Sequence, residues 1–211
     1  MINQKKVLLI TSAGFDKTWK LDINKTFGKK KIEFCVDDKS KIIQRIKHCT
    51  AMIGCPRYVF HNEEYKKFKH LDWIHAGGAG IENYLSKDFK KSNTTFTNGK
   101  IIQGPEVADH AVGLILSFTR NLYFVAKNRH DMMRPLELLK KKILILGLGG
   151  IGMCIAERLA SFGSIVDGVT NDMPVMTSFI NRVYYDDNLN ELVKNYDIVV
   201  CSAPLTKRTK K

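Results

Sequence analysis

The 211-residue sequence lacks the cysteine spacings that bind structural metals. Its five cysteines, at positions 35, 49, 55, 154 and 201, form no Cys-x-x-Cys pair. Such pairs supply the thiolates of zinc sites and of redox motifs, so the pattern argues against both classes and no metal is expected. All five residues are expected to be buried thiols in a reducing compartment, and Cys201 to pack as a small apolar side chain at the end of a strand.

Long apolar stretches are also missing. None reaches the roughly 18 residues that a membrane-spanning helix needs, because the stretch AVGLILSF lies between His110 and Arg120. The N-terminal segment MINQKKVLLITSAG carries lysines before a short apolar run, but it has no convincing signal-peptide cleavage site. These absences predict a folded cytoplasmic protein with no membrane partner.

Acidic residues are too few to balance the basic ones, since 21 Asp and Glu face 34 Lys and Arg and leave a net charge of +13. The basic residues are scattered, with short runs at positions 29–31, 140–142 and 210–211. No aromatic residues alternate with them as stacking platforms, and no nucleic-acid motif occurs. A solvated lysine-rich surface explains the charge better than a polyanion site, so we expect no nucleic-acid partner.

Alternating strand and helix patterns fill the first hundred residues. Strands are expected at 7–11, 32–36, 51–53, 73–76 and 94–97, with a helix at 40–48. A βα series of this kind predicts an open parallel sheet. The string Ala76-Gly77-Gly78-Ala79-Gly80 follows one strand directly. It fits a nest of backbone N–H groups for a carboxylate, and it fits a plain strand-to-helix turn equally well.

A long helix is expected in the next segment, NGKIIQGPEVADHAVGLILSFTRNLYFVAKNRH. Pro105 suits the first helical position, and Glu106 and Asp109 suit the first turn. The apolar set is wide: Val107, Ala108, Ala111, Val112, Leu114, Ile115, Phe118 and Leu122. We therefore expect a helix buried on much of its circumference. It would cross between two α/β sheets, with a domain boundary near residue 100.

A dinucleotide-binding pattern occupies residues 142–163, KILILGLGGIGMCIAERLASFG. An apolar strand stops at Gly147, and a helix follows that Gly163 ends with a left-handed cap. In such a turn Gly147 permits the bend, Gly149 lets the backbone approach a pyrophosphate, and Gly152 lets the helix pack closely. The N-terminus of the helix then offers N–H groups to the phosphates.

Four motifs in order resemble the D-isomer-specific 2-hydroxyacid dehydrogenase family. They are LDWIHAGGAGIENYL, TNGKIIQGPEVADHAVGLILSFTRNL, the glycine segment and DIVVCSAPLTKRT. The resemblance implies an α/β protein with a flavodoxin-like substrate-binding domain at residues 1–100. A crossover helix and an incomplete doubly wound Rossmann NAD(P)-binding domain would follow at residues 101–211. It also implies a homodimer formed through the cofactor domain and the crossover helix.

The resemblance assigns roles to individual residues. It gives the backbone N–H groups of Ala79 and Gly80 to the substrate carboxylate. The cofactor would be bound by Gly150 and Ile151 under the pyrophosphate, and by Ala203, Pro204 and Thr209 along its cleft. His110 matches a histidine of the crossover helix, for which packing and polar anchoring are expected. Neither His110 nor His130, each beside an aspartate, indicates a catalytic dyad.

The residue at the adenosine ribose departs from the family pattern. NAD-preferring relatives carry an acid at the end of the second strand, where this chain has Thr170 followed by Asn171 and Asp172. Asp167 lies too early and is expected to point off the strand. No basic residue adjoins Thr170, and Asp172 would repel a phosphate. The pattern slightly favours NAD over NADP.

The family transfers a hydride between the nicotinamide and C2 of a 2-hydroxy or 2-keto acid, with a histidine, a carboxylate and an arginine as catalytic residues. All three lie beyond the PLT motif, and no residue up to Lys211 matches them. We therefore expect no catalytic residue in this chain and no activity of the chain alone.

The second sheet is expected to contain strands at 142–146, 165–169, 183–185 and 197–201, in the order 3-2-1-4. The fifth and sixth strands would be missing, which leaves IVVC as an exposed apolar edge. Three interpretations stay open. The chain is an incomplete copy of a dehydrogenase, a cofactor-sensing module without catalysis, or an interaction protein that pairs through this edge.

Overall fold

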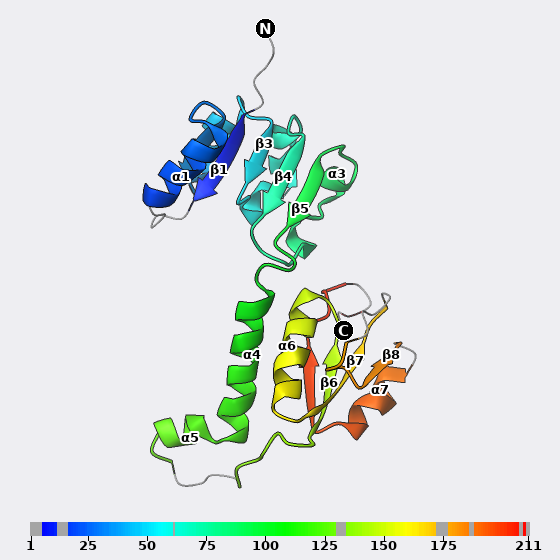
Figure 1. The fold of residues 1–211 in the computed structure, drawn as a ribbon. Helices are drawn as coiled ribbons and strands as arrows, with labels where there is room; N and C mark the ends of the chain where they lie inside the picture. Colours follow the sequence, from blue (N-terminus) through cyan, green and yellow to red (C-terminus); the bar gives the residue numbers. More distant parts are fainter. Residues whose placement is uncertain are drawn as a thin grey trace. The chain divides into compact units, whose positions relative to one another are not determined.

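The computed structural model describes residues 6–11, 17–60, 62–129, 134–171, 177–185, 188–206 and 209. His130, Asp172 and the terminal lysine pair therefore lie outside the described residues. The chain divides into two compact units, Met1–Gly99 and Lys100–Lys211. Each unit contains one sheet in which all strand pairs are parallel (Figure 1). Among the described residues, no helix has both the length and the apolar character needed to span a bilayer.

The first unit has a five-stranded sheet in the order β2-β1-β3-β4-β5. This order is typical of the flavodoxin-like domain that the family resemblance implies. Its elements are β1 (Val7–Thr11), α1 (Lys17–Phe27), β2 (Ile32–Val36), α2 (Lys39–Ile46), β3 (Ala51–Ile53), β4 (Trp73–Ala76), α3 (Lys87–Lys90) and β5 (Thr95–Asn98). Short 3-10 turns lie at Arg57–Phe60, Asn62–Phe68 and Glu82–Tyr84. Four strands have the predicted bounds. The fifth is displaced by one residue because Asn98 pairs with Ala76.

One face of this sheet carries the core of the first unit. Leu8 of β1, Met52 of β3 and Ile74 of β4 are fully buried there. They pack with Ile42 of α2 and with an aromatic cluster that includes Phe60. α2 begins at Lys39, one residue earlier than predicted, because the Asp38 carboxylate caps it by accepting a hydrogen bond from the Lys41 N–H at 3.0 Å. This core holds the ends of β4 and β5 in place.

The second unit has a four-stranded sheet in the order β8-β7-β6-β9, which is the 3-2-1-4 order predicted. Its elements are α4 (Gly104–Thr119), α5 (Leu122–Ala126), β6 (Lys142–Leu146), α6 (Gly150–Ser161), β7 (Ile165–Val169), β8 (Arg182–Tyr184), α7 (Leu189–Leu192), a 3-10 turn at Val193–Asn195 and β9 (Ile198–Cys201). β8 and β9 each deviate by one residue from the predicted bounds. Residues of β6, β7 and α6 form the core, together with Ala108 and Val112 of α4.

The crossover helix α4 corrects one expectation. It runs alongside α6 (Figure 1), but apart from Ala108 and Val112 most of its apolar set is not buried, and Leu114 and Phe118 are 60% and 63% exposed. The helix also stops at Thr119, because Asn121 adopts a left-handed conformation with φ of 58°. Leu122 therefore belongs to the separate helix α5, which has no buried residue.

Two further expectations were wrong. His110 is exposed on α4 and does not pack. Cys201 is exposed and Cys154 is partly exposed, whereas the other three cysteines are buried as expected. His110 is exposed because α4 packs against α6 through one face, which includes Ala108 and Val112. Cys201 is exposed because β9 is the edge strand of the described sheet. Val199 of β9 is accordingly 43% exposed, which agrees with the exposed apolar edge that the sequence predicted.

Candidate functional site

The glycine turn of the second unit connects β6 to α6. Gly147 has φ of 97°, a conformation that favours glycine, and its N–H donates to the carbonyl of Val169 at 2.8 Å. A Cβ at Gly147 would lie 2.8 Å from Ala203. A Cβ at Gly152 would overlap the carbonyl oxygen of Gly147. Both positions therefore require glycine, as the motif predicted.

The N-terminus of α6 has the features of a phosphate site. Gly149 is its N-cap and supplies no side-chain hydrogen bond, and the first hydrogen bond of the helix runs from the Met153 N–H to the Gly149 carbonyl at 2.9 Å. The N–H groups of Gly150, Ile151 and Gly152 precede this bond in the helix, so they have no acceptor within it. A Cβ at Gly149 would meet no atom within 4 Å, so there is open space beside the turn. These residues fit the pyrophosphate of a dinucleotide.

Gly150 also has a packing role that the motif did not reveal. A Cβ there would lie 3.1 Å from the Lys100 carbonyl oxygen. At Gly104 a Cβ would lie 3.1 Å from both the Cys154 sulfur and the Gly150 carbonyl oxygen. The beginnings of α4 and α6 are therefore in close contact, and glycine at both positions allows it.

Ala203 and Pro204 follow β9, which lies next to β6, and the main chain of Ala203 contacts the first glycine of the turn. Thr209 closes the segment, since its hydroxyl donates to the Pro204 carbonyl at 2.8 Å and accepts from the Thr206 N–H at 2.7 Å. The structure thus brings the PLT motif to the glycine turn.

The end of β7 positions Thr170 and Asn171. The Thr170 N–H donates to the Tyr184 carbonyl at 3.1 Å, which fixes the residue against β8. The nearest arginine along β8, Arg182, is hydrogen-bonded to the Tyr184 hydroxyl, and this bond is the main cause of a raised pKa for its guanidinium. Arg182 pairs with Asp167 in the middle of the sheet rather than with the end of β7.

Asp167 does not extend into solvent. It is only 6% exposed, and its carboxylate accepts hydrogen bonds from Asn181 at 2.8 Å and from the Tyr196 hydroxyl at 2.6 Å. Burial, and then the hydrogen bond to Asp167, raises the pKa of Tyr196. Asp167 is thus a structural group that ties β7 to the segment before β9, because a buried carboxylate needs such partners.

In the Ala76–Gly80 segment of the first unit, three carbonyls accept hydrogen bonds, those of Ala76, Gly78 and Ala79. The Asn98 side chain donates to the Ala79 carbonyl at 2.6 Å. The Gly99 N–H donates to the carbonyls of Ala76 at 3.2 Å and Gly78 at 3.3 Å. Within the described part of the chain, no hydrogen bond is found from the N–H groups of Ala79 or Gly80. A Glu82 carboxylate oxygen lies 3.0 Å from the position of a Cβ on Gly80, so one side of the loop is partly filled.

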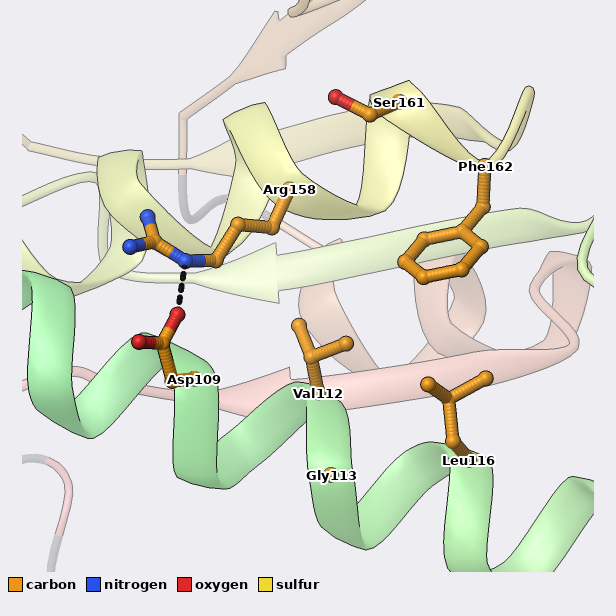
Figure 2. A pocket seen from close by; sticks show the side chains of 7 residues that line it. All are labelled: Asp109, Val112, Gly113, Leu116, Arg158, Ser161 and Phe162. Carbon is orange, nitrogen blue, oxygen red and sulfur yellow. Dashed lines mark hydrogen bonds and ion pairs between the residues drawn. The ribbon is translucent and has the colours of Figure 1, made fainter.

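A groove of about 380 Å³ lies between α4 and α6. Figure 2 shows Val112 and Leu116 of α4 facing Phe162 at one end, with an ion pair at the other. In this pair the Arg158 Nε donates to the Asp109 carboxylate at 2.6 Å, which raises the pKa of the guanidinium. Among the α4 residues that line the groove, Val112 belongs to the apolar set that the sequence predicted to be buried, and it is buried.

Comparison with known proteins gives a consistent result. A family model described as D-isomer specific 2-hydroxyacid dehydrogenase, NAD binding domain, matches residues 112–211. D-3-phosphoglycerate dehydrogenase of Methanocaldococcus jannaschii is 24% identical over 178 residues, which are 82% of this chain and 34% of the relative. Residues 112–211 thus belong to the D-isomer-specific 2-hydroxyacid dehydrogenase family.

Solved structures of this family share the fold. A D-isomer specific 2-hydroxyacid dehydrogenase family protein from Aeromonas salmonicida has a TM-score of 0.76 at 23% identity, covering 97% of this chain and 66% of that one. A D-isomer specific 2-hydroxyacid dehydrogenase from Xanthobacter autotrophicus, in complex with NADPH and MES, has a TM-score of 0.72 at 17% identity, covering 97% and 65%. The chain thus spans about a third of its curated relative and about two thirds of these structures.

The sequence analysis missed the roles of two residues of the family motifs. Asn98 binds the carbonyl of Ala79, and the Ser202 hydroxyl donates to the carbonyl of Gly147 at 2.6 Å. Each lies within a motif quoted for the resemblance. The only available signal was position, since a short polar side chain directly after a buried strand lies at the carboxyl edge of the sheet.

Proposed function

We propose that this chain forms the cofactor-binding and carboxylate-binding parts of an NAD(P)-linked 2-hydroxyacid dehydrogenase. The observation that carries the proposal is the uncapped N-terminus of α6 behind a glycine turn, with open space at Gly149. A pyrophosphate fits there because it accepts hydrogen bonds from main-chain N–H groups and is stabilised by the helix dipole. When bound, the nicotinamide cofactor supplies the hydride acceptor or donor for C2 of the acid.

The residues of the chain divide this work between the two units. Gly150 and Ile151 would donate N–H groups to the pyrophosphate, while Ala203, Pro204 and Thr209 would line the cofactor cleft. In the first unit the N–H groups of Ala79 and Gly80 would bind and orient the carboxylate of a small 2-hydroxy or 2-keto acid. Their lack of other hydrogen-bond partners in the described structure supports this assignment.

NAD is the proposed cofactor, with NADP as the alternative. Thr170 directly follows β7, at the place where the adenosine ribose is bound in this fold. Arg182 is engaged with Tyr184, so it is not directed to a 2′-phosphate. The complex of a relative with NADPH shows that the fold also accepts the phosphorylated cofactor, which makes the preference a matter for measurement.

We further propose that the 211 residues bind these ligands without turning them over. No residue in them matches the arginine, the carboxylate and the histidine that the family uses for substrate polarisation and proton transfer. A protein that senses the cofactor without catalysis would also bind these ligands without turning them over. Pairing through β9 is a second candidate function, favoured by the exposure of Val199 at the edge of the described sheet. A cytoplasmic location stays a prediction.

A thermal melt of the purified chain with and without NADH and NADPH tests the proposal. We expect a cooperative transition that NADH shifts upward by several degrees at saturation, because a ligand that binds only the folded state stabilises it. We also expect a smaller shift with NADPH and no oxidation of NADH when 2-keto acids are added. A cooperative transition that neither cofactor moves would refute cofactor binding.

A further inference from the structure

The segment Thr97-Asn98-Gly99 ends β5 beside the Ala76–Gly80 loop. We propose that Asn98 is a positioning residue that orients the N–H group of Gly80 toward a bound carboxylate, with the Gly99 N–H doing the same for Ala79. The inference rests on the proposed function of this loop as a carboxylate site. It assigns to Asn98 a role in binding, beyond its place in the strand.

The strand end that carries Asn98 is firmly held. In the register of β4 and β5, His75 lies opposite Thr97 and Ala76 opposite Asn98. The Thr97 hydroxyl accepts a hydrogen bond from the Trp73 indole N–H at 2.8 Å and lies 2.9 Å from Nδ1 of His75. These two side-chain contacts add to the ladder of main-chain bonds. The backbone at Asn98 is therefore held in place, and its side chain extends from this restrained strand end.

The geometry of the peptide bond links each bound carbonyl to the next N–H group. In a trans peptide the C=O of one residue and the N–H of the following residue lie in one plane and point in opposite directions, and the structure has no cis peptide among the described residues. Asn98 binds the carbonyl of Ala79 at 2.6 Å, so it also sets the direction of the Gly80 N–H. The Gly99 N–H bonds to the Gly78 carbonyl at 3.3 Å, which sets the direction of the Ala79 N–H.

Gly99 makes the close approach possible. A Cβ at this position would lie 2.5 Å from the carbonyl oxygen of Gly77, so a larger residue would push the loop away. In contrast, Cβ atoms at Gly77 and Gly78 would meet nothing within 4 Å. The loop is thus restrained on the side of β5 and unobstructed at these two glycines. The two N–H groups that face away from the restraining bonds form a pair suited to the two oxygens of a carboxylate.

An amide-resolved titration of the full 211-residue chain with oxalate tests the proposal. Oxalate is the probe because it presents a carboxylate next to a second oxygen-bearing carbon, as 2-keto acids do. We expect the ¹⁵N–¹H signals of Ala79 and Gly80 to move with oxalate in the unmodified chain. Asn98→Ala should weaken oxalate binding by about tenfold, which corresponds to one lost hydrogen bond. It should also shift the Gly80 signal in the absence of oxalate.

Asn98→Asp is the second variant, because it keeps the size of the side chain but replaces the donor Nδ2 with an acceptor that repels the Ala79 carbonyl. It should weaken binding at least as much. Asn93→Ala, at an exposed asparagine just before β5, is the matched control and should bind oxalate normally. If both Asn98 variants are folded and bind like the control, the positioning role is wrong.

The two levels of the proposal fail differently. If oxalate moves no signal of Ala79 or Gly80 even in the unmodified chain, the carboxylate site itself is refuted and the role of Asn98 with it. If neither Asn98 variant folds, a measurement on the unmodified chain still tests the positioning role of Asn98. Its Asn98 side-chain NH₂ protons should exchange slowly with solvent and shift on addition of oxalate, and rapid exchange with no shift would overturn the inference.

Discussion

The hydroxyl of Ser202 donates a hydrogen bond to the carbonyl oxygen of Gly147 at 2.6 Å. This contact joins the end of β9 to the first glycine of the cofactor turn. The Ser202 N–H also donates to the Leu146 carbonyl at 2.9 Å. Because the carbonyl of Gly147 shares its peptide plane with the next N–H group, Ser202 restrains the turn on which the proposed pyrophosphate site depends.

Replacement of Ser202 by alanine should therefore loosen the glycine turn. We expect Ser202→Ala to weaken NADH binding by about five- to tenfold, since a hydrogen bond of this kind contributes about 1 kcal/mol. Isothermal titration or NADH fluorescence measures the change. Ser161→Ala removes an exposed hydroxyl that bonds to the Glu157 carbonyl at the far end of α6, and it should leave the affinity as it is. Equal affinities in the two variants would contradict the restraint.

Gly152→Ala should prevent the chain from forming the cofactor site. The added Cβ would overlap the Gly147 carbonyl oxygen and lie 2.7 Å from the Ser202 hydroxyl, so α6 would have to move away from β6. We expect a loss of several kcal/mol in the free energy of unfolding, as for other overpacked core positions. Denaturant titration followed by circular dichroism measures this loss.

Gly113→Ala is the matched control for that substitution. It also places a Cβ on a helix glycine, but at a position with nothing within 4 Å. Alanine stabilises a helix interior by about 1 kcal/mol relative to glycine, so this variant should be slightly more stable than the unmodified chain. Similar losses in both variants would show that helix glycines are not distinguished by their contacts.

Thr170→Asp should increase the preference for NADH over NADPH. A carboxylate at the end of β7 can accept hydrogen bonds from the ribose hydroxyls and repels a 2′-phosphate. We expect the ratio of the two dissociation constants to change by about tenfold in favour of NADH, as measured by parallel titrations. Thr26→Asp on the exposed side of α1 adds the same charge in the first unit and should leave the ratio unchanged. A ratio that Thr170→Asp does not alter would show that the ribose is bound elsewhere.

Stability in acid should depend on Asp197. Its carboxylate accepts a hydrogen bond from the Lys142 N–H at 2.8 Å, which is the main cause of a pKa lowered from the ordinary value of 3.8. A carboxyl whose pKa is lower in the folded state contributes stability above its unfolded pKa, and that contribution disappears as the pH falls through the folded pKa. The thermal midpoint of the unmodified chain should therefore fall as the pH drops below 3.8, and we expect Asp197→Asn to make this fall smaller.

Asp22→Asn, at an exposed carboxylate of α1, is the control for the acid experiment. Thermal melts of the three proteins across the acid range provide the measurement. If Asp197→Asn and Asp22→Asn follow the unmodified chain equally, the bond to Lys142 does not contribute to acid stability.

The family resemblance implies a homodimer formed through the cofactor domain and the crossover helix, and we propose the exposed side of α4 as its interface. Apolar patches of this kind on a folded chain mark contact surfaces, and Phe118 is 63% exposed. Phe118→Glu should convert a dimer into a monomer, as measured by light scattering after size exclusion. Phe27→Glu, at a phenylalanine of α1 that is 56% exposed, is the control and should stay dimeric. A monomeric unmodified chain would refute the dimer directly.

The strands and the glycine turn could be predicted from the sequence because they depend on local patterns. Ile143, Leu144 and Ile145 form a continuous apolar run, which is typical of a parallel strand buried on both faces. Gly147 and Gly152 stand at spacings that only a tight turn and close packing explain. The strand order of the second sheet could also be predicted, because a glycine turn after the first strand marks the doubly wound arrangement.

Contacts between residues distant in sequence could not be predicted from the sequence. The bonds from Asn98 to Ala79 and from Ser202 to Gly147 join the ends of adjacent strands, and their partners depend on register rather than on neighbouring residues. The exposure of Phe118 on α4 depends likewise on which surfaces meet. The sequence by itself determined the family, the strand order and the glycine turn. Only the tertiary structure decided which side chains restrain the two anion-binding loops, because hydrogen bonds act over about 3 Å and that proximity exists only after folding.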